Sequence, residues 1–206
     1  MPESKPLLIG LSGKAGSGKS TVGDYLAGAH GYAQFAFAGA LKDIVQAAFH
    51  FTDKQMVSGK ESIDPRFGKS PRWCLQHFGT AFRAIWPAIW IHNLRQEILS
   101  FLSMNGQHPI VLTDVRFRDE AEAIKGMGGV LVRIKRGKTG GVQAGTPVPL
   151  DACATAPCAT GIPGHISELD LDAYEDWDEV IRNDGTLSEL ASRVEDMLTA
   201  LAPPNP

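Results

Sequence analysis

The chain has 206 residues, of which 43% are hydrophobic and 21% are charged, and its formal net charge is −3. This composition is ordinary for a globular protein, and the length suggests a single domain, 1–206. The acidic balance argues against a non-specific nucleic-acid binder. No apolar run is long enough to cross a bilayer or to serve as a secretory signal.

Strands and helices alternate along the first part of the chain. "LLIGLSG" is an apolar run ending in glycine, which predicts a buried strand at 7–12. "KSTVGDYLAGAHG" predicts a helix ended by Gly31, and the alternating stretch "YAQFAFA" predicts a second strand near 32–37. "GALKDIVQAAFHF" has helical spacing, and the polar residues 52–72 predict a loop with short helical pieces. Two further helices are predicted in "RWCLQHFGTAFRAIW" and "WIHNLRQEILSFLSM".

The second part of the chain continues the alternation. "PIVLTDVRF" predicts the clearest buried strand, 109–114, which is followed by a helix in "RDEAEAIKGMGG" and a fourth strand in "VLVRIKRG". "DEVIRND" predicts a fifth strand, and Thr186 with Glu189 forms a capping box that begins a final helix. The residues of this helix that we expect to be buried are Leu187, Leu190, Val194, Leu198 and Leu201.

This alternation predicts an α/β fold in which a five-stranded parallel sheet lies between two layers of helices, a three-layer αβα sandwich. The active site of such a sheet lies at the carboxyl ends of its strands. Residues 137–164 depart from the pattern, because they are rich in Gly, Ala, Thr and Pro and nearly lack large apolar side chains. We expect them to form a flexible, lid-like insertion in the single domain.

The stretch "GKAGSGKS", residues 13–20, matches the spacing of a phosphate-binding loop between a strand and a helix. Its glycines let several backbone N–H groups face one point, the lysine reaches the β- and γ-phosphates, and the serine hydroxyl binds Mg²⁺. The pattern therefore predicts ATP or GTP, with Mg²⁺. The residues that we expect at the nucleotide are Gly13, Ala15, Gly16, Ser17, Gly18, Lys19, Ser20 and Thr21.

A carboxylate, Asp114, ends the apolar strand "PIVLTD". At that position it would bind Mg²⁺ together with Ser20, either directly or through a water, or it would orient the acceptor. The alternative is that Asp114 caps the helix that begins just beyond it.

Three segments carry a family resemblance: "SPRWCLQHFGTAFR", "LTDVRFRDEAEAIKGMGGVLVRIKR", and "HISE" followed by "DEVIRNDGTLSEL". Together with the phosphate loop they resemble the deoxynucleoside monophosphate kinases of bacteriophages. The resemblance covers nearly the whole chain except the insertion. It implies a P-loop kinase fold and transfer of the γ-phosphate of ATP to a deoxynucleoside 5′-monophosphate, a small-molecule partner.

The resemblance also implies roles for individual residues. Arg72, Thr80 and Arg83 would lie at the acceptor nucleotide, and Arg116 would lie near the transferred phosphate. The residues Asn183 and Asp184, which follow the fifth strand, would lie near the adenine of ATP. "HISE" contains His165 and Glu168, to which chemistry alone assigns no role.

The residues support phosphate as the acceptor on their own terms. A phosphate acceptor is already an oxyanion and needs cations rather than a catalytic base. By the resemblance, Lys42, just after the second strand, would also face the acceptor phosphate. Arg133 shares one face of its strand with Lys135, so we include Arg133 among the catalytic residues. Most aromatic residues of 72–90 are expected in the core, and Trp90 is retained as an acceptor contact.

Several alternatives stay open. A kinase of another phosphorylated small molecule, of the phosphomevalonate or dephospho-coenzyme A type, fits the same architecture, and so does a DNA-associated P-loop ATPase. The sequence does not identify the accepted bases, and the aromatic helices form either a core or a homodimer face. Three cysteines do not make an even disulfide framework, so a reducing cytoplasmic setting is expected. Cys153, Cys158 and His165 supply three zinc-type ligands without a fourth, which makes a zinc site the less favoured interpretation.

Overall fold

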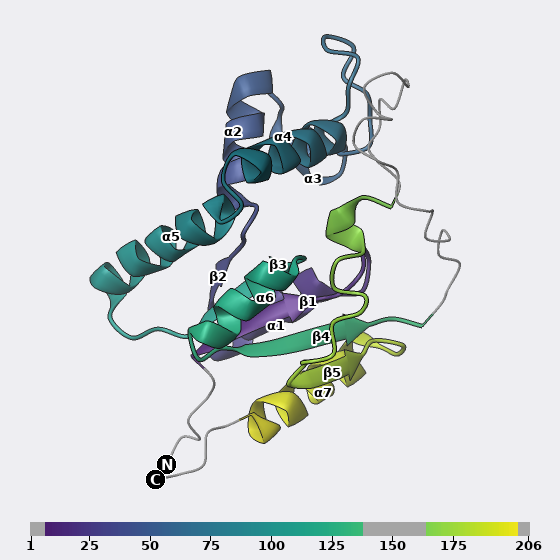
Figure 1. The fold of residues 1–206 in the computed structure, drawn as a ribbon. Coiled ribbons are helices and arrows are strands. Elements are labelled where there is room, and N and C mark those ends of the chain that lie inside the picture. Colours follow the sequence, from purple (N-terminus) through teal and green to yellow (C-terminus); the bar gives the residue numbers. More distant parts are fainter. Residues whose placement is uncertain (1–6, 138–163, 202–206) are drawn as a thin grey trace. The chain divides into compact units, whose positions relative to one another are not determined.

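The computed structural model describes residues 7–137 and 164–201, which form two compact units (Figure 1). Within the described residues, unit 1 comprises 7–37, 94–137 and 170–201, and unit 2 comprises 38–93 and 164–169. All but the two end residues of the predicted insertion, 137–164, lie outside the described residues, so its lid-like character and the single-domain organisation stay predictions.

Unit 1 is built on a parallel sheet. Its strands have the order β2-β3-β1-β4-β5, and each neighbouring pair is parallel. Strand β1 is central, since Ile9 is in register with Val111 on one side and with Val130 on the other. The predicted five-stranded parallel sheet is therefore confirmed. The bounds of the strands are β1 Leu8–Ser12, β2 Ala33–Phe35, β3 Ile110–Val115, β4 Val130–Lys135 and β5 Glu179–Arg182.

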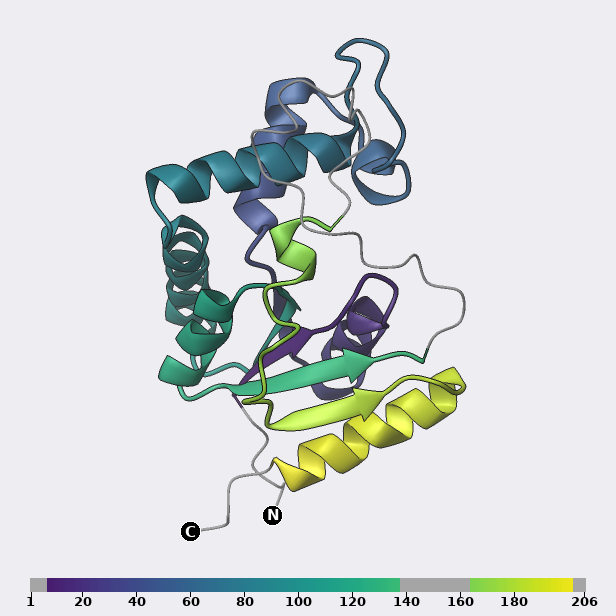
Figure 2. The same cartoon turned by 45° about the vertical axis from the view of Figure 1, so that its right-hand side comes forward.

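Helices cover both faces of this sheet (Figures 1 and 2). Ile9 and Leu11 of β1 are buried in one core with side chains of α1 (Lys19–His30) and α7 (Leu187–Ala200). Gly10 alternates with them and faces α6 (Arg118–Gly126), because a Cβ added at Gly10 would lie 2.6 Å from the Cδ1 atom of Ile124. The alternation of β1 thus confirms the three-layer αβα sandwich.

The final helix begins as predicted. The Thr186 hydroxyl accepts the Glu189 N–H at 3.3 Å, and the Glu189 carboxylate accepts the Thr186 N–H at 2.7 Å. The expected burial of Leu190, Val194 and Leu198 is confirmed, and Leu201 packs against the same core. The expectation for Leu187 is wrong, since this side chain is 74% exposed. It belongs to the first turn of α7, which borders a surface pocket instead of the sheet.

Unit 2 is helical. Its core joins α2 (Gly39–Phe49), α3 (Asp53–Val57), α4 (Pro71–Ile85) and the first turn of α5 (Ile89–Asn105), and its main buried side chains are Leu41, Val45, Phe51, Met56, Cys74 and Trp90. A short 3₁₀ helix, η2 (Ile166–Glu168), also belongs to this unit. Across the described part of the chain, no helix is both long enough and apolar enough to cross a membrane.

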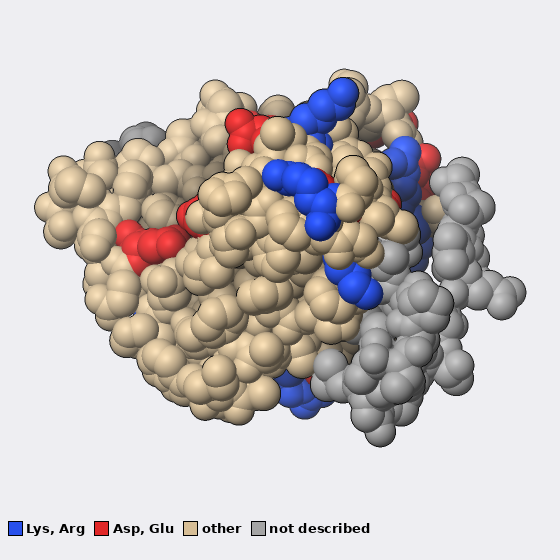
Figure 3. All heavy atoms as spheres, turned by 90° about the horizontal axis from the view of Figure 1, so that it is seen from above, with Lys and Arg blue, Asp and Glu red and all other residues tan. Residues whose placement is uncertain are grey.

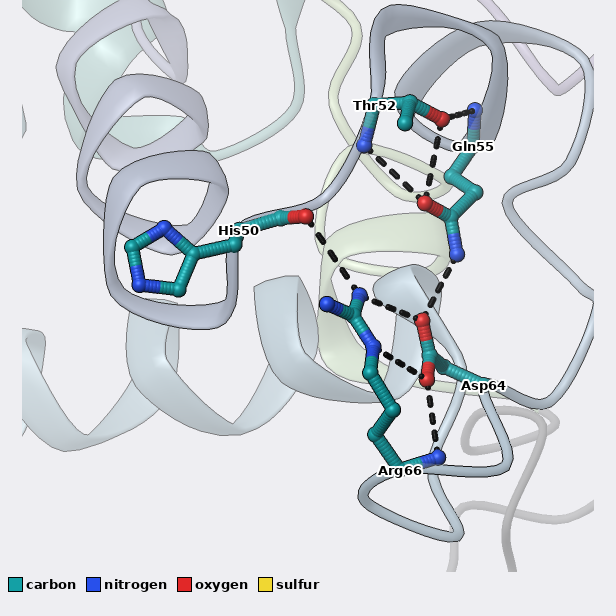
Figure 4. Close-up of polar contacts among 5 residues, drawn as sticks. All are labelled: His50, Thr52, Gln55, Asp64 and Arg66. Carbon is teal, nitrogen blue, oxygen red and sulfur yellow. Dashed lines mark hydrogen bonds and ion pairs between the residues drawn. The ribbon is translucent and has the colours of Figure 1, made fainter.

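A buried carboxylate organises the loop between α3 and α4 (Figure 4). Asp64 is 3% exposed and accepts hydrogen bonds from the Arg66 N–H and Nε and from the Gln55 side-chain amide, at 2.7–2.9 Å. The Arg66 guanidinium also donates to the His50 carbonyl, which connects the loop to the end of α2. The hydrogen bonds from Arg66 are the main cause that lowers the pKa of Asp64 well below its usual value.

This network predicts an acid-dependent stability. The pKa of Asp64 is lower in the folded protein than in the unfolded chain. The contribution of Asp64 to the free energy of unfolding is therefore fully present above the unfolded pKa of about 3.9 and is lost as the pH falls toward the folded pKa. We expect Asp64→Asn to lower Tm at pH 7 by about 4–10 °C, because Arg66 loses its anionic partner.

Thermal unfolding followed by circular dichroism between pH 7 and pH 3 would measure this effect, with Asp43→Asn on the exposed surface of α2 as the matched control. The difference in Tm between wild type and Asp64→Asn should become smaller below about pH 4. A gap that stays constant down to pH 3 would contradict the proposed contribution of the charge.

Candidate functional site

The loop 13–18 connects β1 to α1 and has an unusual backbone. Gly13, Gly16 and Gly18 have φ angles of 146°, 75° and 105°, in the region that side chains disfavour. Gly18 is the N-cap of α1, so the N-terminal N–H groups and the positive end of the helix dipole lie next to the loop. Such an arrangement binds phosphate.

The loop also lies tightly against strand β4. A Cβ added at Gly13 would overlap the Ile134 carbonyl oxygen and would lie 2.6 Å from Ser17 Oγ. Glycine is therefore required at position 13 both by its backbone conformation and by the lack of space. The loop conformation depends in this way on the strand beside it.

Lys19 is the first residue of α1, and its side chain contacts the loop. Its ammonium group donates to the carbonyl oxygens of Gly13, at 2.6 Å, and Lys14, at 2.8 Å. These two hydrogen bonds fold the side chain back along the loop. The positive charge is thereby held at the N-terminus of α1, where a phosphate chain would also be favoured.

Asn183 connects the loop to the end of the sheet. Its side chain is buried, and its Nδ2 donates to the Ser17 carbonyl at 2.8 Å. Its backbone N–H donates to the Lys135 carbonyl at 2.7 Å, which extends the β4–β5 pairing by one residue. Asp184 next to it accepts the N–H of Gly137. Both residues that were expected near the nucleotide base thus have partners in the framework of the site.

A cavity of about 550 Å³ opens beside the loop. Its volume falls in the range of small-molecule sites, and it combines loop amides, cations and one exposed apolar side chain, Leu187. Sequence reasoning missed Leu187, which follows the helical spacing of core residues, and it noted Arg136 as one of a run of cations before the insertion without including it among the site residues. The lining residues are Gly16, Gly18, Lys19, Ser20, Thr21, Arg136, Asn183, Gly185, Thr186 and Leu187.

Asp114 ties two adjacent strands together. Its Oδ1 accepts the N–H of Phe37, just beyond β2, at 2.7 Å. The alternative that Asp114 caps the next helix is wrong, because α6 has Phe117 as its N-cap. The buried Glu120 carboxylate accepts the N–H groups of Arg116 and Phe117 at 2.8 and 3.1 Å. Glu120, three residues after "DVRF", therefore shapes the turn that holds Arg116.

Arg133 and Lys14 share a partner. Arg133 Nη1 donates to the Leu171 carbonyl at 2.7 Å, and its Nη2 lies 3.4 Å from the Asp172 carboxylate. Lys14 of the loop donates to the same carboxylate at 2.6 Å. The guanidinium also lies over the Trp177 ring, 5.2 Å from its centre. Both cations are thus held by the segment that precedes β5.

The expected acceptor residues all belong to unit 2. Arg72 pairs with Glu61, and the Thr80 hydroxyl donates to the Gln76 carbonyl at 2.8 Å. Trp90 is 5% exposed and its indole N–H donates to the Gly79 carbonyl at 3.4 Å, so its observed contacts are core contacts. On the face in Figure 3, Lys and Arg side chains form separate groups and not one continuous basic surface. The two remaining expected residues, Lys42 and Arg83, are half-buried on α2 and α4.

His165, which had no assigned role, has a structural one. Its ring is buried, and Nε2 lies 3.2 Å from the Thr80 hydroxyl while Nδ1 accepts the N–H of Ser167 at 3.2 Å. The ring therefore begins η2 and connects it to α4 within unit 2.

Comparison with known proteins assigns a family. The chain is 31% identical over 201 residues to a protein of Acanthamoeba polyphaga mimivirus named "Putative deoxynucleotide monophosphate kinase", covering 91% of this chain and 94% of the relative. The chain belongs to the deoxynucleotide monophosphate kinase family. It is accordingly a P-loop kinase, a phosphotransferase, as the phosphate loop also indicates. No model of a protein family matches the sequence.

Solved structures resemble the chain more distantly. A gluconokinase of Sinorhizobium meliloti is 18% identical with a TM-score of 0.45, covering 97% of this chain and 95% of that one. TT1252 of Thermus thermophilus is also 18% identical, with a TM-score of 0.49 over 97% and 100% of the two chains. Since these values are low, the fold assignment rests on the strand order and the phosphate loop observed in this chain.

Within residues 7–137 and 164–201, no group of three or more His, Cys, Asp or Glu side chains is placed to bind a metal ion. Cys153 and Cys158 lie outside the described residues, so the zinc interpretation stays a hypothesis. Cys74 is buried in the core of unit 2, and burial raises the pKa of its thiol.

The close approach of the loop to β4 gives a direct prediction. We expect Gly13→Ala to weaken ATP binding by about 100-fold, because the added methyl group would push the loop away from Ile134. Gly28→Ala, in an open position on α1, is the matched control and should raise stability by about 0.5–1 kcal/mol without changing ATP affinity. Calorimetric titration would measure both, and unaltered ATP binding by Gly13→Ala would contradict the loop geometry.

Proposed function

We propose that this kinase transfers the γ-phosphate of ATP to a deoxynucleoside 5′-monophosphate, giving ADP and a deoxynucleoside diphosphate. The observation that carries the proposal is the similarity to the mimivirus protein, whose name specifies this class of acceptor. That similarity covers 91% of the chain, so it extends over residues of both units.

The donor side of the proposed reaction belongs to unit 1. The amides of loop 13–18 and the N-terminus of α1 would hold the phosphates of ATP, and Lys19 would add a positive charge. Ser20 in the first turn of α1 and Asp114 at the end of β3 offer the hard oxygen ligands that suit Mg²⁺. Bound Mg²⁺ would neutralise charge on the phosphates.

The acceptor side would use the cations of unit 2. Because a nucleotide phosphate is already an anion, the reaction needs positive charge and orientation rather than proton removal. Arg72 and Arg83 lie on α4, with Thr80 between them, and Lys42 lies on α2. A guanidinium binds two phosphate oxygens at once, which fixes both position and angle.

Arg116 and Arg133 would stabilise the transferred group. Arg116 follows Asp114 and is held by a turn that Glu120 fixes, so its backbone is pre-ordered. Arg133 keeps its guanidinium beside Leu171 and Asp172, which limits the rotamers available to it. Pre-ordered cations cost little reorganisation when charge moves toward them.

The remaining proposals concern the setting of the reaction. Asp184 would lie near the adenine of ATP, as the family resemblance implies, and Leu187 would offer the base an apolar contact in the cavity. The partner would be a small molecule, and the kinase would act in the cytoplasm.

A coupled ADP-release assay tests the proposed reaction. Mg²⁺-ATP would be supplied with dAMP, dGMP, dCMP, dTMP and their ribose counterparts, with a reaction lacking acceptor as the control. We expect ADP release with one or more deoxynucleotides and little without acceptor. Lys19→Ala should lower kcat/KM by about 100-fold or more, whereas Lys54→Ala on the exposed surface of α3 should not. Flat responses to every nucleotide would refute the proposed acceptor.

The acceptor role of Arg72 makes a separate prediction. Arg72→Gln should raise KM for the deoxynucleotide by about 10- to 100-fold and leave KM for ATP within about twofold, since a charge-assisted hydrogen bond to phosphate is lost. Glu61→Gln removes the partner of Arg72 while keeping the cation, so it should not raise KM for the deoxynucleotide. Steady-state kinetics with each substrate varied in turn would decide. Equal effects of Arg72→Gln on both KM values would count against an acceptor role.

A further inference from the structure

We infer that Asn183 is a positioning residue of the phosphate loop, acting through the Ser17 carbonyl and not through recognition of the ATP base. The inference rests on the nucleotide site of the proposed function, but not on the identity of the acceptor. It assigns to Asn183 the control of phosphate affinity, and it predicts that this residue does not discriminate between ATP and GTP.

The first argument is the geometry of the peptide unit that Asn183 holds. Its Nδ2 donates to the Ser17 carbonyl at 2.8 Å. In a trans peptide the C=O and the next N–H point in opposite directions in one plane. Holding the Ser17 carbonyl toward Asn183 therefore directs the Gly18 N–H away from Asn183. The Gly18 N–H is one of the loop amides next to the start of α1, where phosphate would bind.

The second argument is that the contact is buried. Asn183 is 8% exposed and Ser17 is 3% exposed, so water competes poorly for this hydrogen bond. The backbone of Asn183 is fixed in turn by its own N–H bond to the Lys135 carbonyl at 2.7 Å. Asn183 therefore links the pairing of β4 and β5 to the Ser17 carbonyl of the loop.

The third argument is the fit between Asn183 and Gly18. A Cβ added at Gly18 would overlap the Nδ2 atom of Asn183, and Gly18 has a φ of 105°. The side chain thus fills the space beside this glycine, at a position where the backbone can bend only without a side chain. A residue that contacts the loop this closely is placed to set its shape.

Binding measurements separate the two possible roles. The Kd values of Mg²⁺-ATP, Mg²⁺-GTP and Mg²⁺-tripolyphosphate would be measured by calorimetry for wild type, Asn183→Ala and Asn183→Asp. We expect each variant to raise the Kd of all three ligands by the same factor, which should be about 10-fold or more for Asn183→Ala. Tripolyphosphate has no base, so an equal effect on it would show that the loss concerns phosphate binding. Asn183→Asp keeps the size of the side chain but places an acceptor against the Ser17 carbonyl, so it tests the hydrogen bond if Asn183→Ala is unstable. Asn105→Ala, at the end of α5, is the matched control.

The outcomes are distinguishable. If the variants weaken ATP but leave tripolyphosphate unchanged, or change the ratio of ATP to GTP affinity, Asn183 reads the base and the inference is wrong. If the wild type binds neither ATP nor tripolyphosphate, the inference fails together with the nucleotide site. If the wild type binds them but phosphorylates no deoxynucleotide, only the proposed acceptor fails and the effect of Asn183→Ala on tripolyphosphate still decides the inference.

Discussion

The contact between the phosphate loop and strand β4 is the constraint from which the rest of the site follows. A phosphate loop needs backbone N–H groups that converge on one point, and such a backbone is strained for residues with side chains. In this kinase the loop is supported by the Ile134 carbonyl against Gly13 and by Asn183 against the Ser17 carbonyl. Both supports come from the central sheet, so the alignment of β4 and β5 determines the shape of the loop.

Several cations of this protein lie near the phosphate site, although the net charge of the chain is negative. The chain has a net charge of −3, yet its phosphate loop and the end of β4 are rich in cations. The segment before β5 balances them. Asp172 contacts Lys14 and Arg133, and Asp170 accepts the N–H of Arg118 at the start of α6, at 2.7 Å. Separated cations with acidic neighbours suit the recognition of a small phosphorylated molecule better than that of a long polyanion.

The features that the sequence predicted are those that depend on local rules. The spacing of "GKAGSGKS" and the capping box of Thr186 and Glu189 are short patterns with one structural meaning each, and the alternation of apolar strands and helices led to the parallel sheet. Features that depend on distant residues were not predicted. Asn183 and Ser17 are 166 positions apart, and no periodicity indicates that one holds the other.

The wrong expectation for Leu187 and the contacts that were not predicted also depend on residues distant in the sequence. Leu187 follows the helical spacing of the buried residues, but a helical pattern does not show where the sheet beneath the helix ends. For Asp114 the sequence offered a helix cap as the alternative role, and it did not show that the carboxylate accepts the N–H of Phe37, just beyond β2. The buried network of Asp64 lies in the polar segment 52–72, which was predicted as a loop with short helical pieces and whose composition does not indicate a buried carboxylate.

We propose that the terminal phosphate held by this loop passes to a nucleotide phosphate. The most direct test follows the atom itself, with ATP labelled in its γ-phosphate and a deoxynucleoside monophosphate as acceptor, and separates the products by chromatography. We expect the label to appear in the deoxynucleoside diphosphate, with little in inorganic phosphate. Label found mainly in inorganic phosphate for every deoxynucleotide would mean that the loop serves ATP hydrolysis, and it would contradict the account.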